Sequence, residues 1–477
     1  MTNSKEPQYS TVGDGCNNAN GKPPRRIHLY TSVVILNIVY VVCGAIYAWS
    51  SPVLMKLKLS DSDASTIASS LSLGAMAGPV ISGALLDKLG RKGTVALSMG
   101  FMTSSCLLLT ATRDVILLSV GRFMSGVSWG VTVSSIPIYI AEISEDSVRG
   151  VLNTVMIISI ATGSLFMYAI GPFISYAVLH YILVGICVFF FLLFPLLPNS
   201  PYVLVINNQT IRARDTLSWL RENRSPSYIE NELQTIQKYI SENQTNSASL
   251  MDLFTCKGNR RALMISCSLT ILQQLSGITV VLFYMQNIFE MTGADLSSST
   301  CSLVIGLVKF AAGFVCPFTV KSYGYKKPLT ISMCGSALGM GGLAVYFWLK
   351  FNNFNVDSLS WLPLLSLIIY VFFFISGFGP IPWAISGELF PSNVKPIATM
   401  ITTIGNAFFG FMTTKLFPYL NALIGQEYLF LACTLCCCFS IGFTILVVQD
   451  TTGMSFVEIQ EMLNGKKKKD ILLKQTK

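Results

Sequence analysis

The chain has 477 residues, of which 52% are hydrophobic and 12% are charged. A soluble domain carries roughly 25% charged residues, so this composition excludes an ordinary soluble globular protein. The apolar surplus extends along almost the whole chain, which excludes a disordered or fibrous protein as well. A polytopic membrane protein remains.

Twelve apolar runs follow one another along the chain, each close to the roughly 20 residues that a spanning helix needs. The polar residues 1–28 before the first run do not form a cleavable signal, so the first helix is expected to stay as an anchor. The runs lie at 29–50, 65–86, 93–112, 115–141, 150–172 and 178–198, and then at 260–290, 297–319, 329–350, 361–386, 396–418 and 428–448. One long polar stretch, 199–258, separates the two sets of six.

The fold predicted from this pattern is an all-α membrane protein with twelve transmembrane helices in two pseudo-symmetric six-helix bundles. The predicted parts are an N-terminal tail (1–28), a first bundle (29–198), a loop (199–258), a second bundle (259–449) and a basic tail (450–477). Within the loop, Ile229, Leu233, Ile236 and Ile240 recur at helical spacing with charges between them. They predict a short amphipathic helix that packs beneath the bundles or docks a partner.

Basic residues predict the orientation, because they are retained on the cytoplasmic side. With both termini inside, 26 of the 33 lysines and arginines fall in cytoplasmic segments and 5 fall in outer loops. The net charge of +9 therefore requires no nucleic-acid partner. The run from Lys466 to Lys469 is expected to lie in the field of the anionic lipid surface.

An internal duplication is visible in two loops that lie six helices apart. The loop after the second run reads GALLDKLGRK and the loop after the eighth reads FTVKSYGYKK. Gly90 and Gly324 match, as do the basic residues that follow them, whereas Asp87 corresponds to Lys321. The second copy of the loop motif has therefore lost part of the charge pattern of the first.

Seven short motifs occur in an order that identifies a family. They are Gly121-Arg122, YIAEISEDSVRG ending at Gly150, PNSP at 198–201, QQLSGITVVLFY at 273–284, GPIPW at 379–383, GELFP at 387–391 and DTTG at 450–453. With these motifs the chain resembles the sugar-porter branch of the major facilitator superfamily, which includes facilitative glucose carriers and insect facilitated trehalose transporters. The resemblance implies the major facilitator fold and alternating access around a central site.

Polar residues inside apolar runs indicate where that site lies, because unpaired polar groups are costly in hydrocarbon. Glutamine and asparagine offer both donors and acceptors, which suits them to the hydroxyls of an uncharged sugar, and a tryptophan ring can stack on a sugar face. In isolation these amides would serve equally well as interhelical hydrogen bonds. Together with the resemblance, they predict a substrate site of Gln273, Gln274, Thr279, Tyr284, Lys309, Trp383 and Asn406. Gly377, Gly379, Pro380 and Pro382 are expected to break the tenth helix just before Trp383.

Three positions depart from the family's site. Ile157 stands where a sugar-binding glutamine is usual, and Thr279 and Lys309 stand where asparagines are usual. A lysine in mid-membrane costs at least about 2.5 kcal/mol, so Lys309 is expected to face a water-filled cavity and to alter substrate selection. The alternative is an interhelical hydrogen bond to a carbonyl or hydroxyl.

The first helix contains no Asp or Glu, although proton-coupled relatives place a carboxylate there. Its absence predicts uniport, since coupling requires a group that gains and loses a proton.

Charged residues at the inner helix ends predict a cytoplasmic gate, by resemblance. The set is Asp87, Arg91, Lys92, Glu142 and Arg149 in the first half, and Lys326, Glu388 and Lys395 in the second. Asn199 replaces the family's glutamate and Tyr325 replaces an arginine, so a weaker gate with a larger inward-open population is expected.

The leading functional hypothesis is a plasma-membrane uniporter for a hexose or trehalose, with the sugar and the lipid bilayer as its partners. A non-transporting sugar sensor or degenerate paralogue is one alternative, and an organic-anion carrier that uses Lys309 is another. An enzyme is not expected, because the only histidines are His28 and His180 and no nucleophile, metal or phosphate-loop pattern occurs. No cofactor or metal is predicted, and the scattered cysteines suggest apolar packing.

Overall fold

The computed structural model describes residues 25–245, 250–292, 296–391, 394–451, 454 and 456–464. The run from Lys466 to Lys469 and most of both predicted tails lie outside the described residues.

The first bundle is built from long helices that begin at polar caps. The helices are α1 (Ile27–Ala48), α2 (Ser50–Leu57), α3 (Asp61–Lys88), α4 (Gly90–Ala111), α5 (Val115–Ile143), α6 (Asp146–Ile170) and α7 (Tyr176–Leu193). Ser60, Asp114 and Ser175 each accept a hydrogen bond from an amide in the first turn of α3, α5 and α7, respectively. Such caps satisfy backbone donors that no helical carbonyl can reach.

The second bundle contains more interruptions. Its helices are α12 (Lys257–Leu275), α13 (Ile278–Phe283), α14 (Met285–Thr292), α15 (Ser298–Ala312), α16 (Val315–Tyr323), α17 (Lys326–Phe351), α18 (Leu362–Phe373), α19 (Ile381–Leu389), α20 (Lys395–Ile424) and α21 (Gln426–Leu446). Within the described residues, ten helical stretches are long and apolar enough to span a membrane. The segmented path α12 to α14 and the more polar α20 supply the seventh and eleventh spans.

Two breaks interrupt the helices of the second bundle. Gly277, with φ at +92°, separates α12 from α13 in a conformation that favours glycine. In the tenth span a π-helical turn, Phe374–Phe378, precedes Gly379 and Pro380, and α19 then carries Trp383. The predicted break before Trp383 is present. The helix of the eleventh span is longer than the predicted run of 396–418, because α20 continues to Ile424.

Glycines allow the first-bundle helices to pack backbone against backbone. A Cβ atom on Gly44 of α1 would overlap the carbonyl oxygen of Ile160 on α6, and one on Gly163 would overlap that of Val41. Gly74 of α3 and Gly126 of α5 approach each other's helices in the same way. Close contact through small residues is the usual means of helix association in a membrane, where hydrophobicity gives no preference for protein over lipid.

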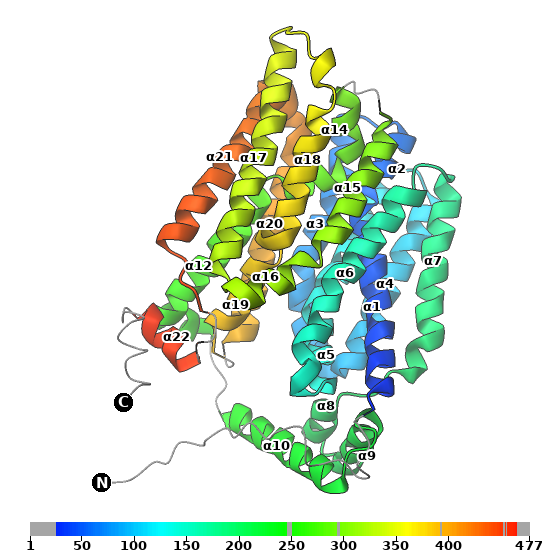
Figure 1. The fold of residues 1–477 in the computed structure, drawn as a ribbon. Helices are drawn as coiled ribbons and strands as arrows, with labels where there is room; N and C mark the ends of the chain where they lie inside the picture. The colour runs from blue at the N-terminus through cyan, green and yellow to red at the C-terminus, as the bar shows by residue number, and fades with distance from the viewer. Residues whose placement is uncertain are drawn as a thin grey trace.

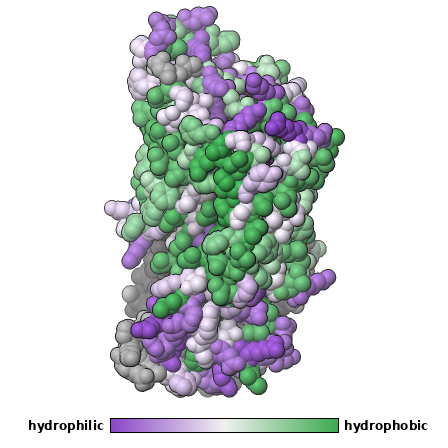
Figure 2. All heavy atoms as spheres, turned by 90° about the vertical axis from the view of Figure 1, so that its right-hand side faces the viewer, coloured by the Kyte–Doolittle hydropathy of each residue, from purple (hydrophilic) through white to green (hydrophobic). Residues whose placement is uncertain are grey.

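On the face that Figure 2 shows, apolar side chains cover the middle of the molecule and hydrophilic residues lie at both ends. We call the end that carries α22 (Phe456–Leu463) and the short helices α8 (Pro201–Ile206), α9 (Thr210–Leu220) and α10 (Pro226–Thr245) the inner end (Figure 1). The charge distribution predicts that this end is cytoplasmic. We call the opposite end the outer end.

The amphipathic segment of the central loop is helical. In α10, Ile229, Leu233 and Ile236 are buried against residues of α8 and α9, and Ile240 lies at the edge of this cluster. The short helix α11 (Leu250–Thr255) leads into α12. The layer formed by α8, α9 and α10 lies beneath the first bundle, where α9 contacts α1 and α8 contacts α5.

Candidate substrate site and gates

Four of the predicted site residues form one chain of hydrogen bonds in the second bundle. Gln274 Nε2 donates to Asn406 Oδ1 at 3.0 Å, and Thr279 Oγ1 donates to Gln274 Oε1 at 2.5 Å. Asn406 Nδ2 donates to the carbonyl of Thr270 at 2.9 Å and to Gln273 Oε1 at 3.3 Å. The helix break at Gly277 places Thr279 beside Gln274. We call Gln273, Gln274, Thr279 and Asn406 the amide chain.

The amide chain is anchored to the broken tenth span. Gln273 Nε2 donates to the carbonyl oxygens of Phe378 at 3.0 Å and Gly379 at 2.6 Å. These carbonyls lie at the π-helical turn, where regular helical bonding is interrupted. Trp383 is the third residue of α19 and is partly exposed. A bound molecule with hydroxyl groups would compete for the hydrogen bonds that the amides now make with one another.

Tyr284 lies away from this chain. Its hydroxyl donates to the carbonyl of Thr414 at 3.3 Å, and its ring stacks on Phe417 with centroids 5.2 Å apart. The side chain is 4% exposed. In this conformation Tyr284 packs α13 and α14 against α20.

Tyr47 of α1 meets the amide chain from the first bundle, which sequence reasoning missed. Its hydroxyl lies 3.3 Å from Thr279 Oγ1. Its ring stacks on Trp129 of α5 at 5.0 Å and meets Phe283 of α13 edge-on at 5.0 Å. Tyr47 and Trp129 are both partly exposed. The sequence carries no signal that separates these aromatics from the many others in the chain.

Lys309 differs from the expectation of a side chain that faces a water-filled cavity. It is 5% exposed, and its Nζ donates to Ser164 Oγ of α6 at 2.9 Å. The ammonium also lies over the ring of Tyr47, 5.8 Å from its centroid. Among the described residues no carboxylate pairs with it. The geometry is that of the alternative, an interhelical hydrogen bond to a hydroxyl.

Arg122 is a second cation buried inside the first bundle. It donates to the carbonyl of Ile46 at 2.7 Å and to Ser50 Oγ at 3.0 Å, and it lies over the Trp49 ring at 4.9 Å. Its Nε has no partner within the described part of the chain. Neutral oxygens and a π face are therefore the groups that compensate this guanidinium.

At the inner end, a carboxylate in each half is held by residues of matching motifs. In the first half, Glu142 accepts from Arg91 at 2.6 Å and from the hydroxyl of Ser200. In the second half, Glu388 accepts from Tyr325 at 2.6 Å and from Thr451 at 2.7 Å. Arg91 follows Gly90 just as Tyr325 follows Gly324, so the two arrangements are related by the duplication.

The second copy has lost the charge of its donor. A phenol replaces the guanidinium, and burial together with Glu388 raises the pKa of Tyr325, so its hydroxyl stays protonated and donates. A neutral donor holds a carboxylate less strongly than an arginine that bonds through two nitrogens.

Most of the remaining predicted gate residues donate to backbone carbonyls. Lys92 donates to the carbonyl of Leu197 at 2.6 Å, Arg149 to that of Ala141 at 3.0 Å, and Lys326 to that of Ile445 at 2.9 Å. Asp87 is exposed, and Lys395 is partly buried close to Glu388. Each of these three carbonyls belongs to the same half as its donor.

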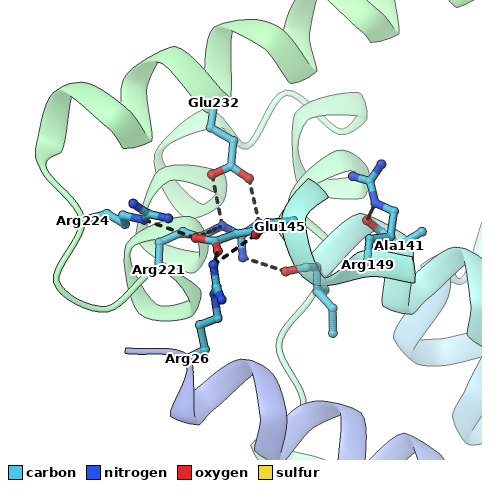
Figure 3. Close-up of polar contacts among 9 residues, drawn as sticks. Arg26, Ala141, Glu145, Arg149, Arg221, Arg224 and Glu232 are labelled. Carbon is cyan, nitrogen blue, oxygen red and sulfur yellow. Dashed lines mark hydrogen bonds and ion pairs between the residues drawn. The ribbon is translucent and has the colours of Figure 1, made fainter. Parts of the chain in front are cut away.

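One strongly charged cluster at the inner end was not predicted (Figure 3). Glu145, in the turn between α5 and α6, pairs with Arg26, accepts from Arg224 at 3.3 Å and lies 3.9 Å from Arg221. Arg221 also pairs with Glu232 at 2.7 Å. The side chains of Glu145, Arg221 and Arg224 are 4%, 1% and 3% exposed. This cluster ties α9 and α10 to the first bundle.

Hydrogen bonds join the two bundles at the outer end. Ser51 Oγ accepts from the amide of Gln286 at 3.3 Å, and Lys415 donates to Thr66 Oγ1 at 2.5 Å. Lys309 with Ser164, and Tyr47 with Thr279, lie further in. Among contacts between described side chains, the inner-end pairs named above stay within one half. The two bundles are therefore closed together at the outer end.

Comparison with known proteins places this architecture. Residues 4–463 match the family model described as "Sugar (and other) transporter". The chain belongs to this family. A member from Drosophila sechellia, "Facilitated trehalose transporter Tret1-2 homolog", is 31% identical over 89% of this chain and 88% of its own length. The Anopheles gambiae "Facilitated trehalose transporter Tret1" is 30% identical over 92% of this chain. The chain spans 57% of that relative's length.

Solved structures show that this sugar-transporter family member has the major facilitator fold. The "partially occluded inward open conformation of the xylose transporter XylE from E. coli" superposes with a TM-score of 0.76 at 19% identity and covers 90% of this chain and 99% of XylE. The inward-open XylE structure gives 0.75 at 20% identity, with 91% and 99% covered. The family and the fold are those of carriers and not of enzymes.

Proposed function

We propose that this protein is a facilitative carrier that moves an uncharged sugar, a hexose or trehalose, by alternating access. The observation that carries the proposal is the amide chain, because it places donors and acceptors without net charge where the two bundles meet. Such groups suit the hydroxyls of a neutral polyol. Its relatives from Anopheles gambiae and Drosophila sechellia are facilitated trehalose transporters, which supports the substrate class.

The proposed substrate site consists of the amide chain with Trp383, and Tyr284 and Lys309 act on it through helix packing. The bundles at 29–198 and 259–449 rock about this site, while the loop at 199–258 stays with the first bundle. The inner carboxylates, Glu142 and Glu388, belong to the gate that closes the inner side. We place the carrier in the plasma membrane. The charge distribution supports an orientation with both termini in the cytoplasm.

Uptake of radiolabelled glucose and trehalose into oocytes tests the proposed function, with surface expression quantified. We expect saturable uptake of at least one sugar, and we expect Trp383→Ala to abolish it, because the truncation removes a large ring beside the amide chain. Trp348→Ala is the matched control, since Trp348 is 49% exposed near the outer end of α17. No uptake from protein verified at the surface would contradict the proposal.

Transport is proposed to be uniport. The helix α1 has no carboxylate, and Arg122 is compensated by the Ile46 carbonyl and the Ser50 hydroxyl, neither of which titrates. Collapsing the proton gradient with an ionophore is therefore expected to leave the initial rate of sugar uptake unchanged. A proton-coupled sugar carrier assayed in parallel is the control. Strong inhibition of this protein would overturn uniport without overturning sugar transport.

A further inference from the structure

The first bundle has no glutamine at the position where the resemblance to the family predicts a sugar-binding amide. Ile157 occupies that position in α6, and its Cγ2 packs 3.7 Å from the Cβ position of Gly313. An aliphatic side chain offers no hydrogen bond to a hydroxyl. If the substrate is held from both sides, the first bundle must supply a polar group from another helix.

Tyr47 supplies a hydroxyl at the right place. Its oxygen lies 3.3 Å from Thr279 Oγ1, and Thr279 bonds Gln274, which bonds Asn406. Tyr47 thus joins the amide chain across the boundary between the bundles. When the outer side opens, α1 and α13 must separate and this bond must break, so the phenol needs another partner in the substrate-loaded carrier.

The ring of Tyr47 is held in place by other aromatics. It stacks on Trp129 with the planes 28° apart and meets Phe283 at 69°. Phe283 is buried, whereas Tyr47 and Trp129 are partly exposed. Aromatic packing of this kind fixes the direction of a hydroxyl at little entropic cost, which is what specific recognition requires.

We propose that Tyr47 is the hydrogen-bonding contact of the first bundle with the sugar, a specificity-determining residue that substitutes for the amide absent at position 157. Trp129 completes the apolar wall beside it. The proposal rests on the proposed function of sugar transport. It assigns to the first bundle a role in choosing among hydroxyl patterns.

Tyr47→Phe tests the proposal, because it removes the hydroxyl and keeps the ring stack. We expect KM for the transported sugar to rise about fivefold, the change that a net hydrogen bond of about 1 kcal/mol gives. The maximal rate should change less. Tyr40→Phe is the matched control: Tyr40 lies in the same helix, is buried, and its hydroxyl has no partner within the described residues. It should leave KM unchanged.

Competition by monodeoxy sugars separates recognition from a structural role. A site that bonds a given hydroxyl rejects the analogue that lacks it, so one deoxy analogue should compete poorly in wild type and regain competition in Tyr47→Phe relative to the parent sugar. The structural role predicts the same profile in both proteins. Sugar uptake that Trp383→Ala abolishes, with KM and deoxy profile unchanged in Tyr47→Phe, would overturn only the role of Tyr47. Absence of sugar uptake by wild type would overturn both proposals.

Discussion

Glu145→Ala is expected to cost about 3–5 kcal/mol of folding stability, the usual effect of removing one partner from a buried ion pair. Arg224 would lose its carboxylate while 3% exposed, and Arg26 would lose its charge partner. Arg221 would keep Glu232 and the carbonyl of Ile143. The loss should therefore fall on the attachment of α9 and α10 to the first bundle.

Thermal unfolding of the detergent-purified protein, followed by size-exclusion chromatography, measures this loss. At about 2–4 °C per kcal/mol for a unit of 150–250 residues, the apparent Tm should fall by about 6 °C or more. Trypsin cleavage within α9, at Arg212 or Arg214, should become faster at the same time.

The chain offers a matched control for the same loop. Glu230 pairs with Arg214 at 2.8 Å, but the two side chains are 42% and 51% exposed, and exposed pairs contribute under about 1 kcal/mol. Glu230→Ala should therefore lower the apparent Tm only slightly. Equal losses in the two variants would show that burial of the Glu145 cluster does not determine its contribution.

Substitutions of Lys309 and Ser164, the two partners of one hydrogen bond, should shift the stability of the outer-closed state in opposite directions. Burying an ammonium without a counter-ion costs several kcal/mol, whereas one hydrogen bond to a charged group returns about 1.5–3 kcal/mol. Desolvation is the larger effect, so Lys309 disfavours the outer-closed state in which it is buried. Lys309→Met should stabilise that state, and Ser164→Ala should destabilise it by about 1–3 kcal/mol because the ammonium then loses its partner.

Labelling from the outside reads this difference. Ser302 is fully buried in α15, one turn outward from Gly306, which faces Tyr168 of α6. In a Ser302→Cys background, membrane-impermeant maleimide should react more slowly when Lys309→Met is added and faster when Ser164→Ala is added. Labelling rates that shift in the same direction in both variants would show that desolvation of Lys309 does not outweigh its hydrogen bond.

Substrate competition in Lys309→Met addresses the organic-anion alternative. If Lys309 selects anions, the variant should lose competition by a sugar acid relative to the neutral sugar. We expect no such change, because the ammonium is engaged between α6 and α15 and its contact with the amide chain is indirect, through the Tyr47 ring.

Features that depend on local chemistry could be predicted from the sequence alone. Twelve spans follow from the length and apolarity of each run. Glycine and proline predicted the break before Trp383, because proline has no amide donor and glycine readily leaves the helical conformation. The amphipathic spacing from Ile229 to Ile240 indicated α10 for a similar reason, since its period is contained within one segment. The family motifs supplied the positions of the amides.

Which side chains meet depends on how the helices pack in three dimensions. Tyr47 lies 232 residues from Thr279, and Lys309 lies 145 residues from Ser164, so no periodicity within a helix could pair them. Glu145 pairs with arginines that come from the start of α1 and from the loop. It becomes buried only when α9 and α10 pack beneath the first bundle. The prediction that Lys309 faces water differed from the structure because a serine hydroxyl on a facing helix, which hydropathy does not reveal, offered it a partner.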